Sequence, residues 1–112
     1  MKTGLIIPCI NQLKAFGEMP TKLEIEDIEK LHNELLNEVE EVEDALKSLH
    51  YHRDGKTIAH YGEEVADVAT RCITLLMAVG MLEEAPDNFA DNTLLWVASK
   101  NYSRGYHDRQ MV

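Results

Sequence analysis

The chain has 112 residues, 45% of them hydrophobic and 28% charged, which is the composition of a folded domain and not of a disordered chain. The formal net charge of −9 argues against general binding to nucleic acids or anionic membranes, because both of those partners are themselves negative. No segment approaches the length and apolarity of a membrane-spanning helix. The two cysteines, Cys9 and Cys72, lack zinc-like spacing, so we expect a reduced, cytoplasmic protein in which Cys72 is a small core residue.

The first half of the chain predicts two helices. Apolar residues recur at helical spacing over residues 5–16, and Gly17 follows as a stop signal. Thr21 is followed three residues later by Glu24, which is the pattern of a capping box at a helix start. The second helix is therefore expected to cover about residues 22–49.

The second half of the chain predicts two more helices. Residues 53–56 carry the glycine and aspartate of a turn, and a third helix follows over about residues 57–82. A fourth helix and a basic tail cover about residues 92–112. We therefore expect one all-α domain over residues 1–112, folded as an antiparallel bundle of about four helices with short connections.

Two pairs of acidic residues are the main functional signal. Glu38 and Glu41 lie on the second predicted helix, and Glu64 and Asp67 lie on the third. Each pair has i, i+3 spacing, which places both carboxylates on one helix face about one turn apart. If the two helices pack antiparallel, the four carboxylates can converge and bind a hard divalent cation, Mg²⁺ or Mn²⁺. The alternative is that these acids only form solvated helix faces.

Glu38 has the most informative position of the four. The apolar stripe of its helix steps by four and three residues, and position 38 completes that rhythm between Leu35 and Val42. A carboxylate on a packed face is costly unless it is paired, hydrogen-bonded or bound to a metal. On the third helix, Glu64 and Asp67 are expected to flank the apolar stripe, which is formed by Ile58, Tyr61, Val65, Val68, Cys72, Leu75 and Val79.

Further charged residues lie near the acidic pairs. Arg71 follows Glu64 and Asp67 along one ribbon of the third helix, so we expect an ion pair within this helix. A fifth carboxylate, Glu34 or Glu63, is a candidate base or outer partner of a metal site, although a solvent-facing position is the simpler interpretation of both.

The C-terminal segment gathers groups that suit phosphate binding. Over residues 100–112 three cations stand against one acid, in contrast to the rest of the chain. Guanidinium, ammonium and amide groups donate hydrogen bonds to phosphate oxygens. The alternative is a basic helix end that interacts only with the helix dipole. The candidate phosphate-binding residues are Lys100, Asn101, Arg104 and His107.

Together these motifs resemble the MazG-like family of the all-α nucleoside triphosphate pyrophosphohydrolases. That family has an E-x-x-E helix, a spacer and an E-x-x-D helix, and here the two motifs are residues 38–41 and 64–67. The resemblance covers about residues 21–107 and departs from the family at Asp108, where glycine often follows the histidine. The residues that fit the end of the family pattern in order are Lys100, Asn101, Arg104 and His107.

The resemblance implies an activity, a cofactor and an assembly. The expected reaction is hydrolysis of a (deoxy)nucleoside triphosphate to the monophosphate and pyrophosphate. The resemblance implies that Glu38, Glu41, Glu64 and Asp67 bind Mg²⁺, with the basic C-terminal residues binding the substrate. It also implies a homodimer or homotetramer in which a second subunit completes a four-helix bundle.

Two alternatives stay open at this point. The chain could be a non-catalytic acidic helical module that binds a nucleotide or a protein. It could also be a related enzyme that acts on another phosphoanhydride. Turnover, and the position at which the phosphate chain is cut, separate these alternatives from the pyrophosphohydrolase.

Overall fold

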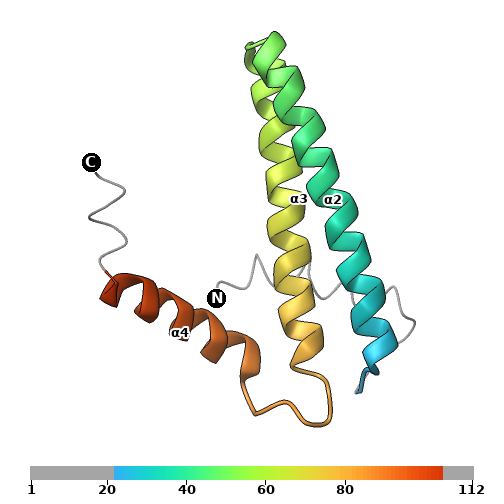
Figure 1. Ribbon diagram of the computed structural model, residues 1–112, viewed down its shortest axis with the longest axis vertical. Coiled ribbons are helices and arrows are strands. Elements are labelled where there is room, and N and C mark those ends of the chain that lie inside the picture. Colours follow the sequence, from blue (N-terminus) through green and yellow to red (C-terminus); the bar gives the residue numbers. More distant parts are fainter. Residues whose placement is uncertain (1–21, 105–112) are drawn as a thin grey trace.

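The computed structural model describes residues 22–104, and this part of the chain contains three helices and no strand. They are α2 (Ile25–Tyr51), α3 (Gly55–Val79) and α4 (Phe89–Ser103). The long helices α2 and α3 lie side by side as an antiparallel hairpin, and α4 extends away from the end of α3 (Figure 1). The all-α prediction is confirmed for this part. The helix predicted over residues 5–16, Thr21 and His107 lie outside the described residues.

The boundaries of α2 differ by two or three residues from the prediction of 22–49. The helix begins at Ile25, after a turn in which the Glu24 amide donates to Asp27 Oδ2 at 2.9 Å. This bond satisfies a backbone donor that the first helical turn leaves open. At the other end the helix continues to Tyr51, and the amide of His52 donates to the Ser48 carbonyl at 2.8 Å.

The start of α3 is fixed by a reciprocal cap that the prediction placed inside a turn. Asp54 Oδ1 accepts a hydrogen bond from the Thr57 amide at 2.9 Å, and the Asp54 amide donates to Thr57 Oγ1 at 3.1 Å. The backbone hydrogen bond from Thr57 is the largest cause that lowers the pKa of Asp54. With Asp54 as N-cap, the helix begins at Gly55, two residues earlier than predicted.

The end of α3 is set by Gly80 and not by residue 82 as predicted. A Cβ on Gly80 would lie 3.3 Å from the Met77 carbonyl oxygen and 3.5 Å, an ordinary van der Waals distance, from Cβ of Phe89, the first residue of α4. The tighter of these contacts is with the backbone of α3 itself. Asn88 precedes α4 in the left-handed region, with φ 58°, a conformation that asparagine tolerates better than most residues. The helix starts three residues before the predicted residue 92.

The hydrophobic core lies at the open end of the hairpin. It contains Leu23, Leu31 and Ala78, with partly buried Ile28 and Leu75 packed against it. Further along α2, Ala45 is also buried. The predicted stripe of α2 is thus confirmed, and Glu38 is one of its partly buried members, together with Leu35, Val42 and Leu49.

The packed face of α3 overlaps the predicted stripe without matching it fully. Of that stripe Tyr61, Val68, Leu75 and Val79 are partly buried, and the face also includes partly buried Glu64 and Arg71 and buried Thr74 and Ala78. In contrast, Ile58 is 55% exposed and Val65 42% exposed. The prediction that Cys72 is a core residue is wrong, because its side chain is exposed beside this face. The predicted stripe follows hydrophobicity, whereas the actual face includes Glu64 and Arg71, which meet polar groups of α2.

The third helix of the described part, α4, buries little. It contacts α3 and makes no contact with α2, and Leu95 and Trp96 are 68% and 65% exposed. None of the helices within residues 22–104 combines the length and apolarity needed to cross a membrane.

Candidate metal centre

Three of the four predicted acidic residues come together in the middle of the α2–α3 hairpin. Each of Glu38, Glu41 and Glu64 offers a carboxylate oxygen, and these three oxygens lie within 4.8 Å of one another. We call these residues the acidic trio. The i, i+3 spacing supplies Glu38 and Glu41 from one face of α2, and the antiparallel packing brings Glu64 of α3 opposite them. Asp67 does not belong to the trio.

Two members of the acidic trio are partly buried, and the third, Glu41, is exposed. The side chains of Glu38 and Glu64 are only 18% and 15% exposed. The Oε2 atom of each is buried and, within the described part of the chain, has no hydrogen-bond partner. A buried acceptor without a partner costs about 1–3 kcal/mol, and more when it is charged. A cation bound beside these two oxygens and the third carboxylate would satisfy them.

The surroundings of Glu38 disfavour its charged form. Burial raises the pKa of Glu38, and the nearby charge of Glu41 raises it further. The charge of Asp67 acts in the same direction, so Asp67 lies close enough to affect this carboxylate. The positive charge of Arg71 acts in the opposite direction and lowers the pKa of Glu38, but it does not outweigh these effects. The trio therefore repels itself without a cation, and a bound divalent ion would relieve that repulsion.

The acidic trio has the donor chemistry that a Mg²⁺ site requires. Carboxylate oxygens are the hard ligands that Mg²⁺ and Mn²⁺ prefer. Two oxygens bound to one Mg²⁺ at about 2.0–2.1 Å lie at most about 4.2 Å apart. The three oxygens of the trio lie within 4.8 Å of one another, so they would have to approach one another to bind one ion.

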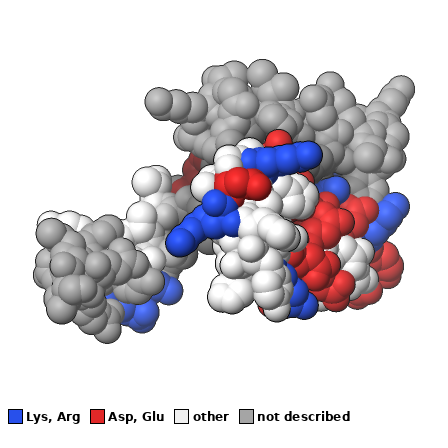
Figure 2. Space-filling view, turned by 90° about the horizontal axis from the view of Figure 1, so that it is seen from above, with Lys and Arg blue, Asp and Glu red and all other residues white. Residues whose placement is uncertain are grey.

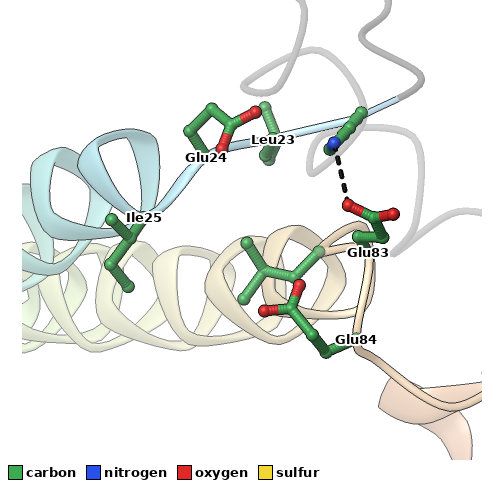
Figure 3. Close-up of a pocket in the computed structure, with 7 residues that line it drawn as sticks. Leu23, Glu24, Ile25, Glu83 and Glu84 are labelled. Carbon is green, nitrogen blue, oxygen red and sulfur yellow. Dashed lines mark hydrogen bonds and ion pairs between the residues drawn. The ribbon is translucent and has the colours of Figure 1, made fainter.

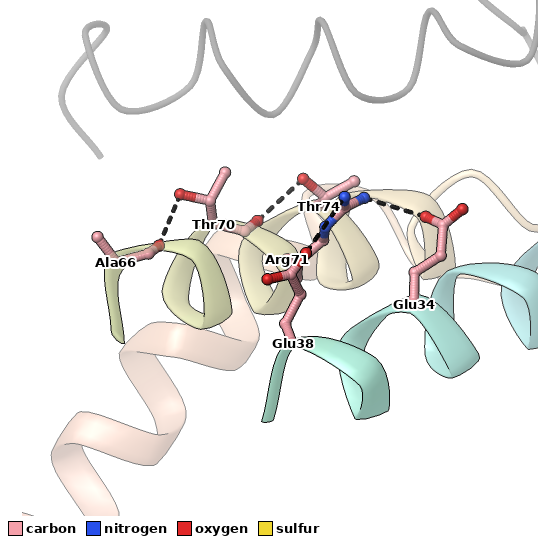
Figure 4. A network of polar contacts seen from close by, with 6 residues as sticks. All are labelled: Glu34, Glu38, Ala66, Thr70, Arg71 and Thr74. Carbon is pink, nitrogen blue, oxygen red and sulfur yellow. Dashed lines mark hydrogen bonds and ion pairs between the residues drawn. The ribbon is translucent and has the colours of Figure 1, made fainter. Parts of the chain in front are cut away.

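Arg71 connects the two helices beside the trio (Figure 4). Its Nη1 donates to Glu34 Oε2 at 3.0 Å, and its Nη2 lies 3.7 Å from Glu38 Oε1. The sequence favoured a pair of Arg71 with Glu64 or Asp67 within α3, whereas Arg71 forms its ion pairs with Glu34 and Glu38 of α2. The signal that could have shown this is the i, i+4 spacing of Glu34 and Glu38 on the packed side of α2.

His60 lies on the other side of the trio. Its Nε2 is 3.9 Å from Glu64 Oε1, one helical turn away on α3, and its side chain is 53% exposed. At this distance the contact is an ion pair only when the histidine is protonated, and it leaves Glu64 Oε2 without a partner.

The candidate phosphate-binding residues lie apart from the acidic trio within one chain. Lys100 and Asn101 are partly buried and Arg104 is exposed, all at the C-terminal end of α4. Because α4 leads away from the hairpin and does not touch α2, these residues do not contact Glu38 or Glu41 of the same chain (Figure 1). His107 lies outside the described residues.

Acidic side chains also gather on one flank of the molecule. Viewed along the hairpin from its tip, they cover the side on which α2 lies (Figure 2). A separate pocket of about 610 Å³ occurs at the open end, far along both helices from the trio. It lies between the start of α2 and the turn after α3, where Lys22 Nζ pairs with Glu83 Oε2 at 3.0 Å (Figure 3). The remaining residues that line it are apolar or acidic: Leu23, Glu24, Ile25, Leu82 and Glu84.

Comparison of the chain with protein-family models, with curated proteins and with solved structures gave no match.

Proposed function

We propose that the protein is a Mg²⁺-dependent nucleotide pyrophosphohydrolase, which converts a (deoxy)nucleoside triphosphate to the monophosphate and pyrophosphate. The observation that carries the proposal is the convergence of Glu38, Glu41 and Glu64, two of which have a buried carboxylate oxygen without a hydrogen-bond partner among the described residues. The resemblance to MazG-like proteins in the E-x-x-E and E-x-x-D motifs supports the choice of reaction.

The acidic trio would hold the metal, with Asp67 beside it as the fourth carboxylate of the motif. Three carboxylates do not fill the six oxygen positions that Mg²⁺ requires, so positions remain for water and substrate phosphate. When bound, the ion supplies charge neutralisation for phosphate oxygens and lowers the pKa of a bound water. Without the ion, the same carboxylates would repel a triphosphate, so activity should depend strictly on the divalent cation.

An exposed apolar surface on the hairpin supports self-association. Four apolar side chains carry this surface, and each comes directly after a buried or partly buried residue of its own helix. They are Val39 and Leu46 of α2 and Ile58 and Val65 of α3. Because the helices are antiparallel, this one-residue step turns both sets toward the same side of the hairpin. All four side chains are between 39% and 55% exposed. We propose that this surface is buried in a homodimer or homotetramer.

Self-association also provides a role for α4. Within one chain α4 leads away from the acidic trio, so Lys100, Asn101 and Arg104 would serve the trio of another subunit. There the two cations would balance phosphate charge and the amide would orient the nucleotide.

The test is pyrophosphate release from a panel of ribo- and deoxynucleoside triphosphates, with Mg²⁺ or with EDTA. Glu38→Gln keeps the shape of the side chain and removes the charged ligand, so we expect at least about a 100-fold loss of turnover. Glu40→Gln, an exposed position on the same helix, is the matched control and should keep full activity.

Each outcome separates the candidate functions. Metal-dependent pyrophosphate release that is lost in Glu38→Gln supports the proposal. Metal-dependent release of orthophosphate would be consistent with the metal site but would reject a pyrophosphohydrolase. A folded protein that turns over no nucleotide rejects the enzyme and favours the binding module.

A further inference from the structure

Arg71 lies near two carboxylates of α2, Glu34 and Glu38, whereas a simple surface ion pair involves only one. Its guanidinium is 27% exposed and reaches from α3 to two carboxylates of α2. The short contact, 3.0 Å, is to Glu34, and the longer contact, 3.7 Å, is to Glu38. Only the contact to Glu34 is within hydrogen-bond distance, so Glu34 fixes the position of the guanidinium beside Glu38.

The two oxygens of Glu38 have different surroundings. Oε1 faces the guanidinium of Arg71, whereas Oε2 is buried and has no hydrogen-bond partner among residues 22–104. The guanidinium beside Oε1 restricts rotation of the Glu38 carboxylate and leaves Oε2 for a different ligand. Groups that orient metal ligands in this way commonly matter almost as much as the ligands themselves.

We propose that Arg71, anchored by Glu34, is a positioning residue that holds Glu38 in the orientation needed to bind the divalent cation. The inference rests on the proposed metal site and assigns to it two residues outside the acidic motifs. Arg71 acts through Glu38 and is not itself a ligand, because a guanidinium is always charged and has no lone pair to offer.

A purely electrostatic role of Arg71 predicts the opposite result. If Arg71 only placed a positive charge near the site, its removal would strengthen the attraction for a divalent cation. If Arg71 orients Glu38, its removal lets the carboxylate rotate and weakens cation binding. The sign of the change in affinity therefore distinguishes positioning from bulk charge.

The experiment measures the affinity of the full chain for Mn²⁺ alone, by calorimetry or by the electron paramagnetic resonance signal of free Mn²⁺. We expect Arg71→Gln to weaken Mn²⁺ binding by about 10–100-fold. We expect Glu34→Gln to weaken it too, although the charge of Arg71 remains. Lys47→Gln is the matched control, because it removes an exposed cation of α2, in a 3.9 Å pair with Asp44, and should change the affinity little.

Unchanged or tighter Mn²⁺ binding in folded Arg71→Gln would overturn the inference. If that variant does not fold, Arg71→Lys decides: it keeps the positive charge but loses the two-armed guanidinium, so positioning predicts weaker Mn²⁺ binding and bulk charge predicts no change. Failure of the proposed metal site would give a different result. Either the wild type would bind no Mn²⁺, or Glu38→Gln would bind Mn²⁺ as tightly as the wild type does. A loss in Glu38→Gln without a loss in Arg71→Gln and Glu34→Gln would reject only the positioning role.

Discussion

Glu38 places a charged carboxylate where packing favours an apolar side chain. Its neighbours on the packed face of α2 are Leu35 and Val42, and its side chain is only 18% exposed. Burial and the charge of Glu41 raise its pKa, so at neutral pH the ionised form opposes folding of the metal-free protein. We expect Glu38→Gln to raise the free energy of unfolding in EDTA, by on the order of 1 kcal/mol.

The gain from Glu38→Gln should depend on pH. The folded protein holds the Glu38 proton more tightly than the unfolded chain does, so the destabilisation is present above the raised folded pKa. It disappears as the pH falls through that pKa toward the ordinary value of 4.5. The advantage of Glu38→Gln should therefore be greatest near pH 7 and shrink at acid pH. Urea denaturation at several pH values measures it, and an advantage that grows toward acid pH would contradict this explanation.

Sequence reasoning located Glu38 but missed the arrangement of Arg71. Spacing alone places position 38 on the packed face, because Leu31, Leu35, Val42 and Ala45 define that face clearly. On α3 the predicted stripe is only partly correct: Tyr61, Val68 and Leu75 are partly buried, whereas Val65 is exposed and neighbouring Glu64 is partly buried. Glu64 and Arg71 lie near carboxylates of α2, and the pattern of a single helix does not show such cross-helix pairing.

At the scale of elements, Asp54 determines where α3 begins. Its carboxylate accepts from the Thr57 amide, and this hydrogen bond lowers the pKa of Asp54. We expect Asp54→Ala to lower the melting temperature, whereas Asp54→Asn keeps an acceptor and should retain most of the stability.

The pH dependence of the Asp54 cap is opposite to that of Glu38. Because the folded pKa lies below the ordinary value of 3.8, the stabilisation is fully present above that value. It is lost as the pH falls through the folded pKa. Wild type and Asp54→Asn should therefore converge in melting temperature under strongly acid conditions, and a difference that persists there would contradict the charged cap.

The helices themselves were largely predictable, and their ends were not. Three helices of the described part were expected, but each starts two or three residues away from its predicted start. The reason is local: Asp54 caps α3 from within a predicted turn, and Asn88 begins α4 from a left-handed conformation. Such caps are made by one side chain or one backbone angle, whereas hydrophobic periodicity averages over many residues.

For the whole molecule, the proposal requires sites shared between subunits. We expect Glu38→Gln and the double variant Lys100→Ala/Arg104→Ala each to be inactive as homo-oligomers. When the two variants are unfolded together and refolded as a mixture, some sites combine the intact acidic trio of the double variant with the intact α4 of Glu38→Gln. For random pairing into dimers, about a quarter of the wild-type activity should return.

The control for that experiment is the mixture of each variant with itself, which should stay inactive. Sedimentation of the wild type should show a dimer or tetramer, and Leu46→Glu on the exposed apolar surface should shift it toward monomer. A monomeric wild type, or no recovery of activity in an oligomeric mixture, would contradict sites shared between subunits.

The central claim is hydrolysis at the α-phosphorus by water in a carboxylate-bound metal site. Its most direct test is turnover of the best substrate of the panel in ¹⁸O-labelled water with Mg²⁺, followed by mass spectrometry of both products. We predict that the label enters the nucleoside monophosphate and that the pyrophosphate stays unlabelled. Label in the pyrophosphate would show attack at the β-phosphorus, and either that result or the absence of any labelled product would contradict the claim.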